Sequence, residues 1–203
     1  MTNNPEPLRV AVLASGTGSL LQAILNAQDS SYVVVGVFAD KPCEAIDRAR
    51  RHIPAPQTVQ VVDFSNFGQA RRPQWNSLLA DSVAASSPDV VVSAGFMRIL
   101  GEEFLDRFGG RTINTHPALL PKFPGAHAVR DALAAGAKVT GTTVHYVDAG
   151  VDTGPVIEQR EVPVHPGDDE STLHERIKTV EREMIVDVLR GFRSLGTRAR
   201  PGG

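Results

Sequence analysis

The chain alternates short apolar runs with segments of helical periodicity, and this alternation limits its fold more than any other feature. Residues 32–39 (YVVVGVFA) are continuous and rich in valine, which is typical of a parallel strand buried on both faces. A similar run at residues 8–15 stops at a glycine turn, and residues 19–27 then carry four apolar side chains on one helical stripe. We therefore predict the first half of a βαβ unit.

The same alternation continues along the chain. We predict further strands at residues 58–62, 89–94 and 111–115, and helices at 44–52, from Pro73 to the break at 86–88, at 102–108 and at 126–135. In the helix from Pro73, the periodicity places Trp75, Leu78, Leu79 and Val83 on one side. Residues 139–147 and 156–164 are patterned like an antiparallel pair, and Thr172 with Glu175 predicts a capping box at the start of the last helix.

These elements predict an α/β fold with an open, mostly parallel, Rossmann-like sheet, helices on both faces and a late antiparallel strand pair. A chain of 203 residues suits one domain. We expect a loose leader at residues 1–7, one domain at 8–195 and a disordered tail at 196–203.

Composition excludes several classes of function. The net charge of −2 lacks the basic excess of a protein that binds nucleic-acid phosphates. No secretory signal or long apolar stretch is visible, so we expect no membrane contact and a soluble, cytoplasmic protein. The single cysteine, Cys43, excludes an internal disulfide and a multi-cysteine metal site, and it fits a reducing compartment.

The glycine turn after the first strand is a candidate phosphate site. In open α/β sheets, ligands bind outside the carboxyl ends of the strands, where backbone N–H groups and a helix N-terminus attract anions. Gly16 and Gly18 permit close approach, and Ser19 adds a hydroxyl. Leu21 stands where a dinucleotide fingerprint has its third glycine, so a phosphate monoester is better supported, although Asp40 would suit a ribose. A plain tight turn remains the alternative.

A second candidate site lies where the strand at residues 111–115 meets a proline-rich loop. Asn114 and His116 are two residues apart on a strand and so point to the same face. Prolines at positions 117, 121 and 124 exclude helix and central strand, which predicts a rigid loop. An amide donor beside an imidazole can stabilise an oxyanion, and the imidazole can carry a proton. A surface turn with one solvated histidine remains the alternative.

A third candidate is Asp152, which lies in a loop between Gly150 and Gly154. A carboxylate beside an imidazole favours the charged form of the ring. Asp148 is the competitor, with the character of a turn residue. No serine or cysteine has the context of a nucleophile, and the histidines lack metal-ligand spacing, so we expect no metal. We assign a surface or core-edge role to the other histidines, namely His52, His127, His145, His165 and His174.

Four segments together resemble the phosphoribosylglycinamide formyltransferases, which are monofunctional, 10-formyltetrahydrofolate-dependent enzymes of purine biosynthesis. The segments are SGTGS at 15–19, AGFMRIL at 94–100, INTHPALLPKFPG at 113–125 and GTTVHYVDAGVDTGPVI at 141–157. The resemblance runs from about residue 8 to the last helix. It implies small-molecule substrates, glycinamide ribonucleotide and 10-formyltetrahydrofolate as co-substrate, and a monomer or homodimer.

The resemblance also implies roles for individual residues. The catalytic trio falls on Asn114, His116 and Asp152. The ribonucleotide falls on Gly16, Thr17, Gly18, Ser19, Leu20 and Glu181, and the folate on Arg72, Met97, Arg98, Ile99, Leu100, Asn114, Val151 and Asp152. The family often has asparagine where Thr17 and Leu20 stand, so a side-chain amide contact at position 20 is lost. The Leu120–Pro121 bond matches one that is cis in relatives.

Three alternative functions remain open at this point. The Asn-x-His-Pro run marks the wider formyltransferase group, which includes methionyl-tRNA formyltransferase and formyltetrahydrofolate hydrolase. Relatives of these two carry an additional domain, C-terminal and N-terminal respectively, and we expect neither domain here. A non-catalytic nucleotide-binding module would explain the glycine turn, but it would leave Asn114, His116 and Asp152 without a role.

Overall fold

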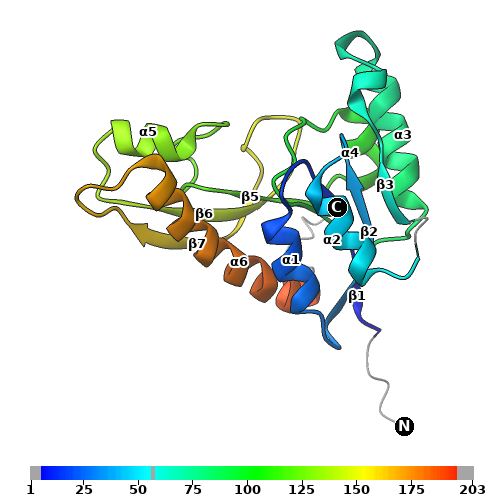
Figure 1. Cartoon of the computed structure of the whole chain (residues 1–203), viewed down its shortest axis with the longest axis horizontal. Helices are drawn as coiled ribbons and strands as arrows, with labels where there is room; N and C mark the ends of the chain where they lie inside the picture. The colour runs from blue at the N-terminus through cyan, green and yellow to red at the C-terminus, as the bar shows by residue number, and fades with distance from the viewer. Residues whose placement is uncertain (1–5, 56–57, 196–203) are drawn as a thin grey trace, which may run out of the picture.

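A seven-stranded sheet in the order β3-β2-β1-β4-β5-β6-β7 forms the centre of the computed structural model, which describes residues 6–55 and 58–195 (Figure 1). The strands are β1 (Leu8–Ala14), β2 (Tyr32–Ala39), β3 (Val59–Val61), β4 (Val90–Ser93), β5 (Thr112–His116), β6 (Val139–Tyr146) and β7 (Val156–Pro163). Strands β1 to β5 pair in parallel, whereas β6 pairs antiparallel with both β5 and β7. The predicted sheet is confirmed, including its late antiparallel pair.

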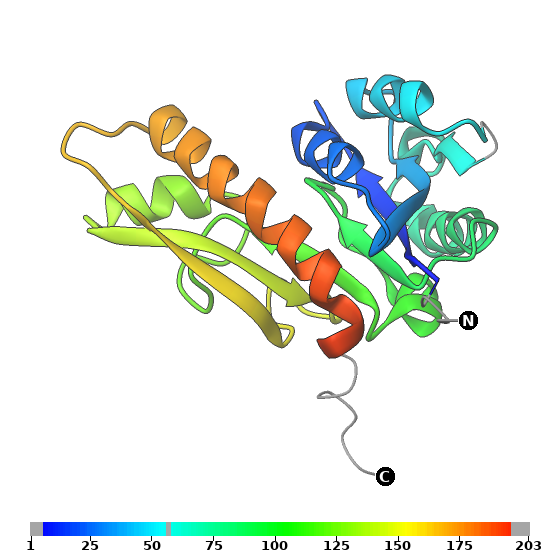
Figure 2. The same ribbon diagram turned by 90° about the horizontal axis from the view of Figure 1, so that it is seen from below.

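Helices cover both faces of the sheet, as predicted. They are α1 (Ser19–Asn26), α2 (Glu44–His52), α3 (Arg72–Ala84), α4 (Glu102–Phe108), α5 (Ala128–Ala134) and α6 (Glu170–Leu195), with the short 3₁₀ helices η2 (Phe64–Asn66) and η3 (Gln69–Arg71). Figure 2 shows α6 running diagonally across the antiparallel strands, with α1 beside it.

The alternation of side chains along β1 explains why both faces need a cover. Val10 and Val12 pack into the apolar cluster that includes α1, α2 and α6, whereas Ala11 and Leu13 pack into the cluster beneath α3 and α4. All four side chains are fully buried. A strand whose two faces are both apolar can be satisfied only between two layers of helices.

The predicted helical stripe on α3 is wrong at one position. Trp75, Leu79 and Val83 are fully buried, but Leu78 is 45% exposed. Residue 78 follows Trp75 by three positions and precedes Leu79 by one, so it lies at the margin of the stripe.

The start of the last helix also differs from the prediction. Helix α6 begins at Glu170, and Asp169 caps it by accepting from the Thr172 N–H at 2.8 Å. The Thr172 hydroxyl accepts from the Asp169 N–H at 3.0 Å in return. The capping box is therefore present three residues earlier, with Thr172 at its third helical position. Both aspartate and threonine are suitable N-cap residues, and Asp169 is the N-cap residue of α6.

No helix within the described ranges combines the length and apolarity that crossing a bilayer requires. The expected leader is described only at residues 6–7, and the expected tail at 196–203 lies outside the described residues. The domain boundaries stay a prediction.

Candidate active site

A cleft of about 490 Å³ opens at the carboxyl ends of β1, β4 and β5. Strand β1 lies between β2 and β4, so the chain passes to opposite sides of the sheet at this place. Ligands of open α/β sheets bind at such a switch point. The loop at residues 148–152 and one face of α6 complete the lining.

Almost every residue singled out from the sequence lines this cleft. They are Gly16, Thr17, Gly18, Ser19, Leu20, Met97, Arg98, Ile99, Leu100, Asn114, His116, Val151, Asp152 and Glu181. Arg72 does not line the cleft. Its guanidinium donates to the backbone carbonyl of Ile99 at 2.8 Å. Contact between Arg72 and folate stays a prediction.

The glycine turn has the backbone geometry of an anion site. Gly18 has φ +72°, and a Cβ there would lie 2.8 Å from Ala45 in α2, so no larger residue fits. The Gly16 carbonyl accepts from the Ala45 N–H at 3.1 Å, and the Thr17 carbonyl accepts from Arg48 at 2.7 Å. Both carbonyls are thus held by α2. Gly18 is the N-cap residue of α1 and has no side chain that could cap the helix. The first N–H groups of α1 are the natural donors for a phosphate.

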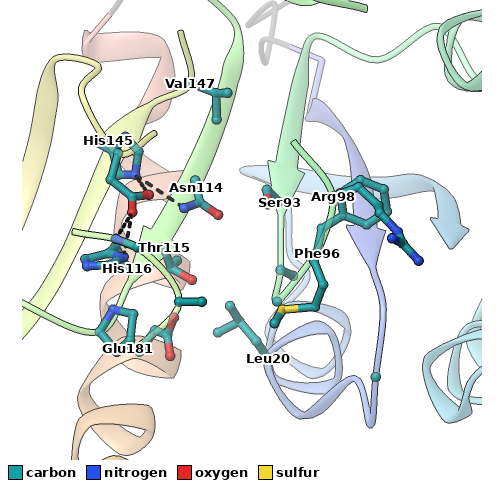
Figure 3. Close-up of a pocket in the computed structure, with 18 of the residues that line it drawn as sticks. Leu20, Ser93, Phe96, Arg98, Asn114, Thr115, His116, His145, Val147 and Glu181 are labelled. Carbon is teal, nitrogen blue, oxygen red and sulfur yellow. Dashed lines mark hydrogen bonds and ion pairs between the residues drawn. The ribbon is translucent and has the colours of Figure 1, made fainter. Parts of the chain in front are cut away.

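Strand β5 delivers Asn114 and His116 together to the other side of the cleft (Figure 3). Asn114 is partly exposed, whereas His116 is only 4% exposed. The proline-rich loop that follows returns to the ring, and the Phe123 carbonyl lies 2.8 Å from His116 Nε2. The Leu120–Pro121 bond within this loop is cis, as expected from the resemblance.

Both ring nitrogens of His116 face oxygen acceptors. Nε2 donates to the Phe123 carbonyl, and Nδ1 lies 3.3 Å from Asp152 Oδ2. A neutral imidazole has one donor nitrogen and one acceptor nitrogen, whereas an imidazolium has two donors. The doubly protonated ring is the form that satisfies both contacts.

Asp152 is held in an ionised state at the mouth of this site. Its pKa is lowered, first by hydrogen bonding toward His145, whose Nε2 lies 3.6 Å from Oδ1, then by the Gly125 N–H at 2.8 Å and the charge of His116; burial acts in the opposite direction. Asp152 has φ +55°, a conformation that aspartate tolerates better than most residues. A Cβ on Gly154 would lie 1.8 Å from the Tyr146 carbonyl, so the turn requires glycine there.

His145 belongs to the site, and its predicted surface or core-edge role is incomplete. The ring is 2% exposed, donates through Nδ1 to the Tyr146 carbonyl at 2.8 Å, and places Nε2 3.3 Å from Asn114 Nδ2. Figure 3 shows it beside Asn114. His145 pairs with Asn114 across β5 and β6. His145 could not be placed in the site from the sequence, because this pairing depends on strand register, that is, on how two distant segments align.

Helix α6 adds Lys178, which the sequence did not single out, and His174, whose predicted surface or core-edge role is incomplete. His174 and Lys178 line the cleft together with Glu181. Burial raises the pKa of the Glu181 carboxyl, against a hydrogen bond from Thr115 and the charges of Lys178 and Arg182. Burial also lowers the pKa of His174. His174, Lys178 and Glu181 follow one another at steps of four and three residues, so they lie on one face of α6, and the structure shows that this face lines the cleft.

Asp40 does not have the position that a ribose contact would need. It is 1% exposed, does not line the cleft, and accepts from Arg98 Nε at 2.7 Å. Within residues 6–55 and 58–195, no group of three or more His, Cys, Asp or Glu side chains is arranged to hold a metal ion. The expectation that no metal takes part stays a prediction.

The chain is similar to several known proteins. A family model described as formyl transferase matches residues 8–189. A phosphoribosylglycinamide formyltransferase from Mycobacterium tuberculosis is 55% identical over 182 residues, which cover 89% of this chain and 82% of that protein. The enzyme of the same name from Escherichia coli is 39% identical, over 91% of this chain and 87% of that one.

Solved structures show the same relationship. The crystal structure of glycinamide ribonucleotide transformylase 1 from Geobacillus kaustophilus superposes with a TM-score of 0.84 at 39% identity, covering 92% of this chain and 99% of that one. A phosphoribosylglycinamide formyltransferase from Bacillus halodurans gives a TM-score of 0.84 at 36% identity, covering 91% and 94% of the two chains.

Proposed function

The chain belongs to the formyl transferase family, and within it to the phosphoribosylglycinamide formyltransferases, and on this premise we propose how its cleft holds two substrates and joins them. The reaction is transfer of a formyl group to the amine of glycinamide ribonucleotide, a step of purine biosynthesis. The formyl donor is 10-formyltetrahydrofolate.

One observation carries this proposal. Asn114, His116 and Asp152 meet on one side of the cleft, while the glycine turn at residues 16–18 lies in the same cleft. An anion held at the turn therefore places the remainder of its molecule beside a set of polar groups suited to acyl transfer. A module that only binds a nucleotide has no use for a buried imidazole tied to a carboxylate.

The cleft wall formed by residues 95–101 fits the flat, largely apolar ring system of a folate. Met97 is 70% exposed and Ile99 52% exposed on this wall, and Val151 is 51% exposed on the loop opposite. Large apolar side chains exposed around a cleft mark a ligand-binding surface. The pterin and benzoyl rings are proposed to lie between them.

The ribonucleotide is proposed to occupy the opposite end. Its phosphate accepts from the N–H groups of Gly18 and Ser19, and its sugar or amide contacts Glu181. Leu20 is only 8% exposed and supplies no polar group where relatives often have an asparagine. The backbone donors are unaffected by this difference, so the proposed identity of the ligand is unchanged.

The chemistry is an acyl transfer. The amine nitrogen attacks the formyl carbon, a C–N bond forms, and charge develops on the formyl oxygen. The Asn114 amide donates to that oxygen, and the imidazolium of His116 stabilises it through its positive charge. The bond from the formyl carbon to folate N10 then breaks, while one proton passes from the amine to N10.

Asp152 has two tasks in this scheme. It orients His116 through the Nδ1 contact at 3.3 Å and lies where its negative charge balances the positive charge of an imidazolium. Its ionised carboxylate also helps to relay the proton from the amine toward N10 through water. Holding both substrates in contact supplies much of the remaining acceleration, because positioning can contribute roughly 7–11 kcal/mol.

An assay with three acceptors tests the proposal. Formyl release from 10-formyltetrahydrofolate is measured with glycinamide ribonucleotide, with initiator tRNA and with water alone. We expect transfer to the ribonucleotide only. Preferred transfer to tRNA would favour a methionyl-tRNA formyltransferase, loss to water a formyltetrahydrofolate hydrolase, and no turnover with any acceptor a binding module. The comparisons favour none of these three alternatives.

The proposed partners are the two small-molecule substrates, without nucleic acid or membrane. A monomer or homodimer and a cytoplasmic location stay predictions.

Replacing Glu181 by glutamine is expected to weaken ribonucleotide binding and to stabilise the fold. A hydrogen bond to a charged group contributes about 1.5–3 kcal/mol, so the KM for the ribonucleotide should rise on the order of tenfold or more. The pKa of Glu181 is raised in the folded protein. The stability associated with the protonated Glu181 carboxyl is therefore fully present below the unfolded pKa of about 4.3. It is lost as pH rises through the folded pKa, because the buried carboxyl must then ionise.

The measurement is Tm against pH for both proteins, together with both KM values. The variant should exceed the wild type in Tm at pH 7–8, and the difference should vanish as pH falls toward about 4. Glu183→Gln is the matched control, because Glu183 is exposed on the same helix and does not line the cleft. A Tm difference that grows as pH falls contradicts the assigned burial effect.

Replacing His145 by alanine is expected to lower kcat by roughly 10- to 100-fold, the range that follows from displacing reacting groups by up to about 1 Å. The ring contacts both Asn114 and Asp152, so its loss frees both side chains. His127→Ala is the control, because His127 is exposed and outside the cleft. Steady-state kinetics decide the matter, and unchanged kcat in a folded variant removes His145 from the site.

A further inference from the structure

The cleft wall at residues 95–101 joins β4 to α4 without helix or strand. It exposes Met97 and Ile99 to the cleft, where the formyl donor is proposed to lie. A binding surface on irregular backbone keeps one shape only if surrounding groups fix it.

Three hydrogen bonds from side chains of neighbouring elements fix the backbone of the wall. The Ser15 hydroxyl accepts from the Met97 N–H at 2.8 Å, and Asn76 Oδ1 accepts from the Gly101 N–H at 2.9 Å. Arg72 donates to the Ile99 carbonyl at 2.8 Å. These side chains come from the end of β1 and from α3, so the wall is held from two elements.

The fourth tie is a salt bridge from the end of β2. Arg98 Nε lies 2.7 Å from Asp40 Oδ2, and the guanidinium carbon of Arg98 lies 4.3 Å from the centre of the Phe64 ring. Figure 3 shows Arg98 extending away from the side where Asn114 and His116 lie. The guanidinium is thus engaged by a carboxylate and by an aromatic face.

Stability alone does not explain why the Asp40 carboxylate is buried. Its side chain is 1% exposed, and among the residues the structure describes, Oδ1 has no hydrogen-bond partner. Removing a carboxylate from water is strongly unfavourable, and one cation on a single oxygen offsets this incompletely. A pair of apolar residues would stabilise the same place at least as well, so the pair is better explained by geometry.

We infer that Asp40 is a positioning residue for the formyl donor: through Arg98 it locks the cleft wall in the shape that presents Met97 and Ile99. The pair also holds the Arg98 guanidinium against Asp40 and the Phe64 ring. This inference rests on the proposed placement of the donor along the wall. Asp40 itself touches neither substrate, because it does not line the cleft.

Uniform loosening of a binding wall has a specific kinetic signature. A contact made equally in the ground state and the transition state changes KM and leaves kcat unaltered. Asp40→Asn keeps the size of the side chain and removes its charge. We expect its KM for 10-formyltetrahydrofolate to rise about tenfold, which corresponds to about 1.4 kcal/mol. Its kcat and its KM for glycinamide ribonucleotide should stay near the wild-type values.

A double-mutant cycle with Arg98→Met shows whether the effect passes through Arg98. The doubly substituted protein should show no larger donor KM than Arg98→Met alone, because the Asp40 charge acts only through Arg98. Asp81→Asn is the matched control, since Asp81 on α3 forms an exposed pair with Arg107 on α4. Additive effects of the two substitutions, or equal changes in both KM values and kcat, overturn the inference.

Trp75 provides a second readout that does not depend on turnover. It is the single tryptophan of the chain, and its ring lies 5.1 Å from Phe64 and 6.2 Å from Phe96, centre to centre. Loosening the wall should shift its emission in Asp40→Asn but not in the Asp81→Asn control. Unchanged emission together with an unchanged donor KM overturns the inference.

The test remains decisive if Asp40→Asn does not fold. The variant Asp40→Leu with Arg98→Met replaces the buried pair by apolar groups, which proteins tolerate. It should fold and show the raised donor KM, and a wild-type KM there overturns the inference. Absence of formyl transfer by the wild-type protein would count against the proposed function instead, and the emission of Trp75 would still report on the lock.

Discussion

Replacing His116 by alanine is expected to lower kcat on the order of a thousandfold, because the substitution removes both a positive charge at the developing oxyanion and a proton carrier. The ring is nearly buried and is held at both nitrogens, so its position is fixed before substrates arrive. Both KM values should change little, since the charge acts mainly in the transition state. Steady-state kinetics with both substrates measure the effect.

His165→Ala is the control for this substitution. His165 is exposed in the segment between β7 and α6 and does not line the cleft. Circular dichroism and thermal unfolding establish that the His116 variant retains the fold. Near-normal formyl transfer by a folded His116→Ala protein would remove this residue from the catalytic assignment, and with it the proposed role of Asp152.

Replacing Asp152 by asparagine is expected to lower kcat by roughly 100- to 1000-fold, the range typical of losing a group that stabilises transition-state charge. Asparagine keeps the size of the side chain but replaces one carboxylate oxygen by an NH₂ group. The groups that face this position, His116 Nδ1 and the Gly125 N–H, are themselves donors. The imidazolium then loses its counter-charge in a nearly buried site. Asp47→Asn is the control, because Asp47 forms an exposed pair on α2.

The same variant tests the electrostatics of the site through stability. The pKa of Asp152 is lowered in the folded protein. Its contribution to stability is therefore present above the unfolded pKa of about 3.9 and is lost as pH falls through the lower folded pKa. The Tm difference between wild type and Asp152→Asn should be constant at neutral pH and should shrink in acid below about pH 4. A difference that stays unchanged within the acid range below about pH 4 contradicts an ionised, stabilising Asp152.

Local sequence signals were sufficient for most of the fold. Continuous valine-rich runs, helical stripes and glycine turns act within a few residues, so the strands and helices follow from them. The errors have the same local origin. Leu78 lies at the margin of its stripe, and Asp169 competes with Thr172 for the cap of α6. In both cases neighbouring residues offered similar choices, and packing or hydrogen bonding selected one.

The candidate site was predictable where one element carries two functional groups. Asn114 and His116 are two residues apart on β5, so the strand period alone places both in the cleft. The glycine turn is likewise complete within residues 16–19. The resemblance to a known family supplied Asp152 and Glu181 with roles, and the structure shows both in the same cleft.

By itself, therefore, the sequence determined the order of elements, the glycine turn after β1 and the shared face of Asn114 and His116. Tertiary structure alone decided that His145 joins Asn114 from 31 residues away, and that Asp40 pairs with Arg98 across 58 residues. It also directed Arg72 to the Ile99 carbonyl instead of into the cleft lining. The physical reason is range: periodicity and backbone sterics act over one or two turns, whereas strand order and register decide which distant side chains meet.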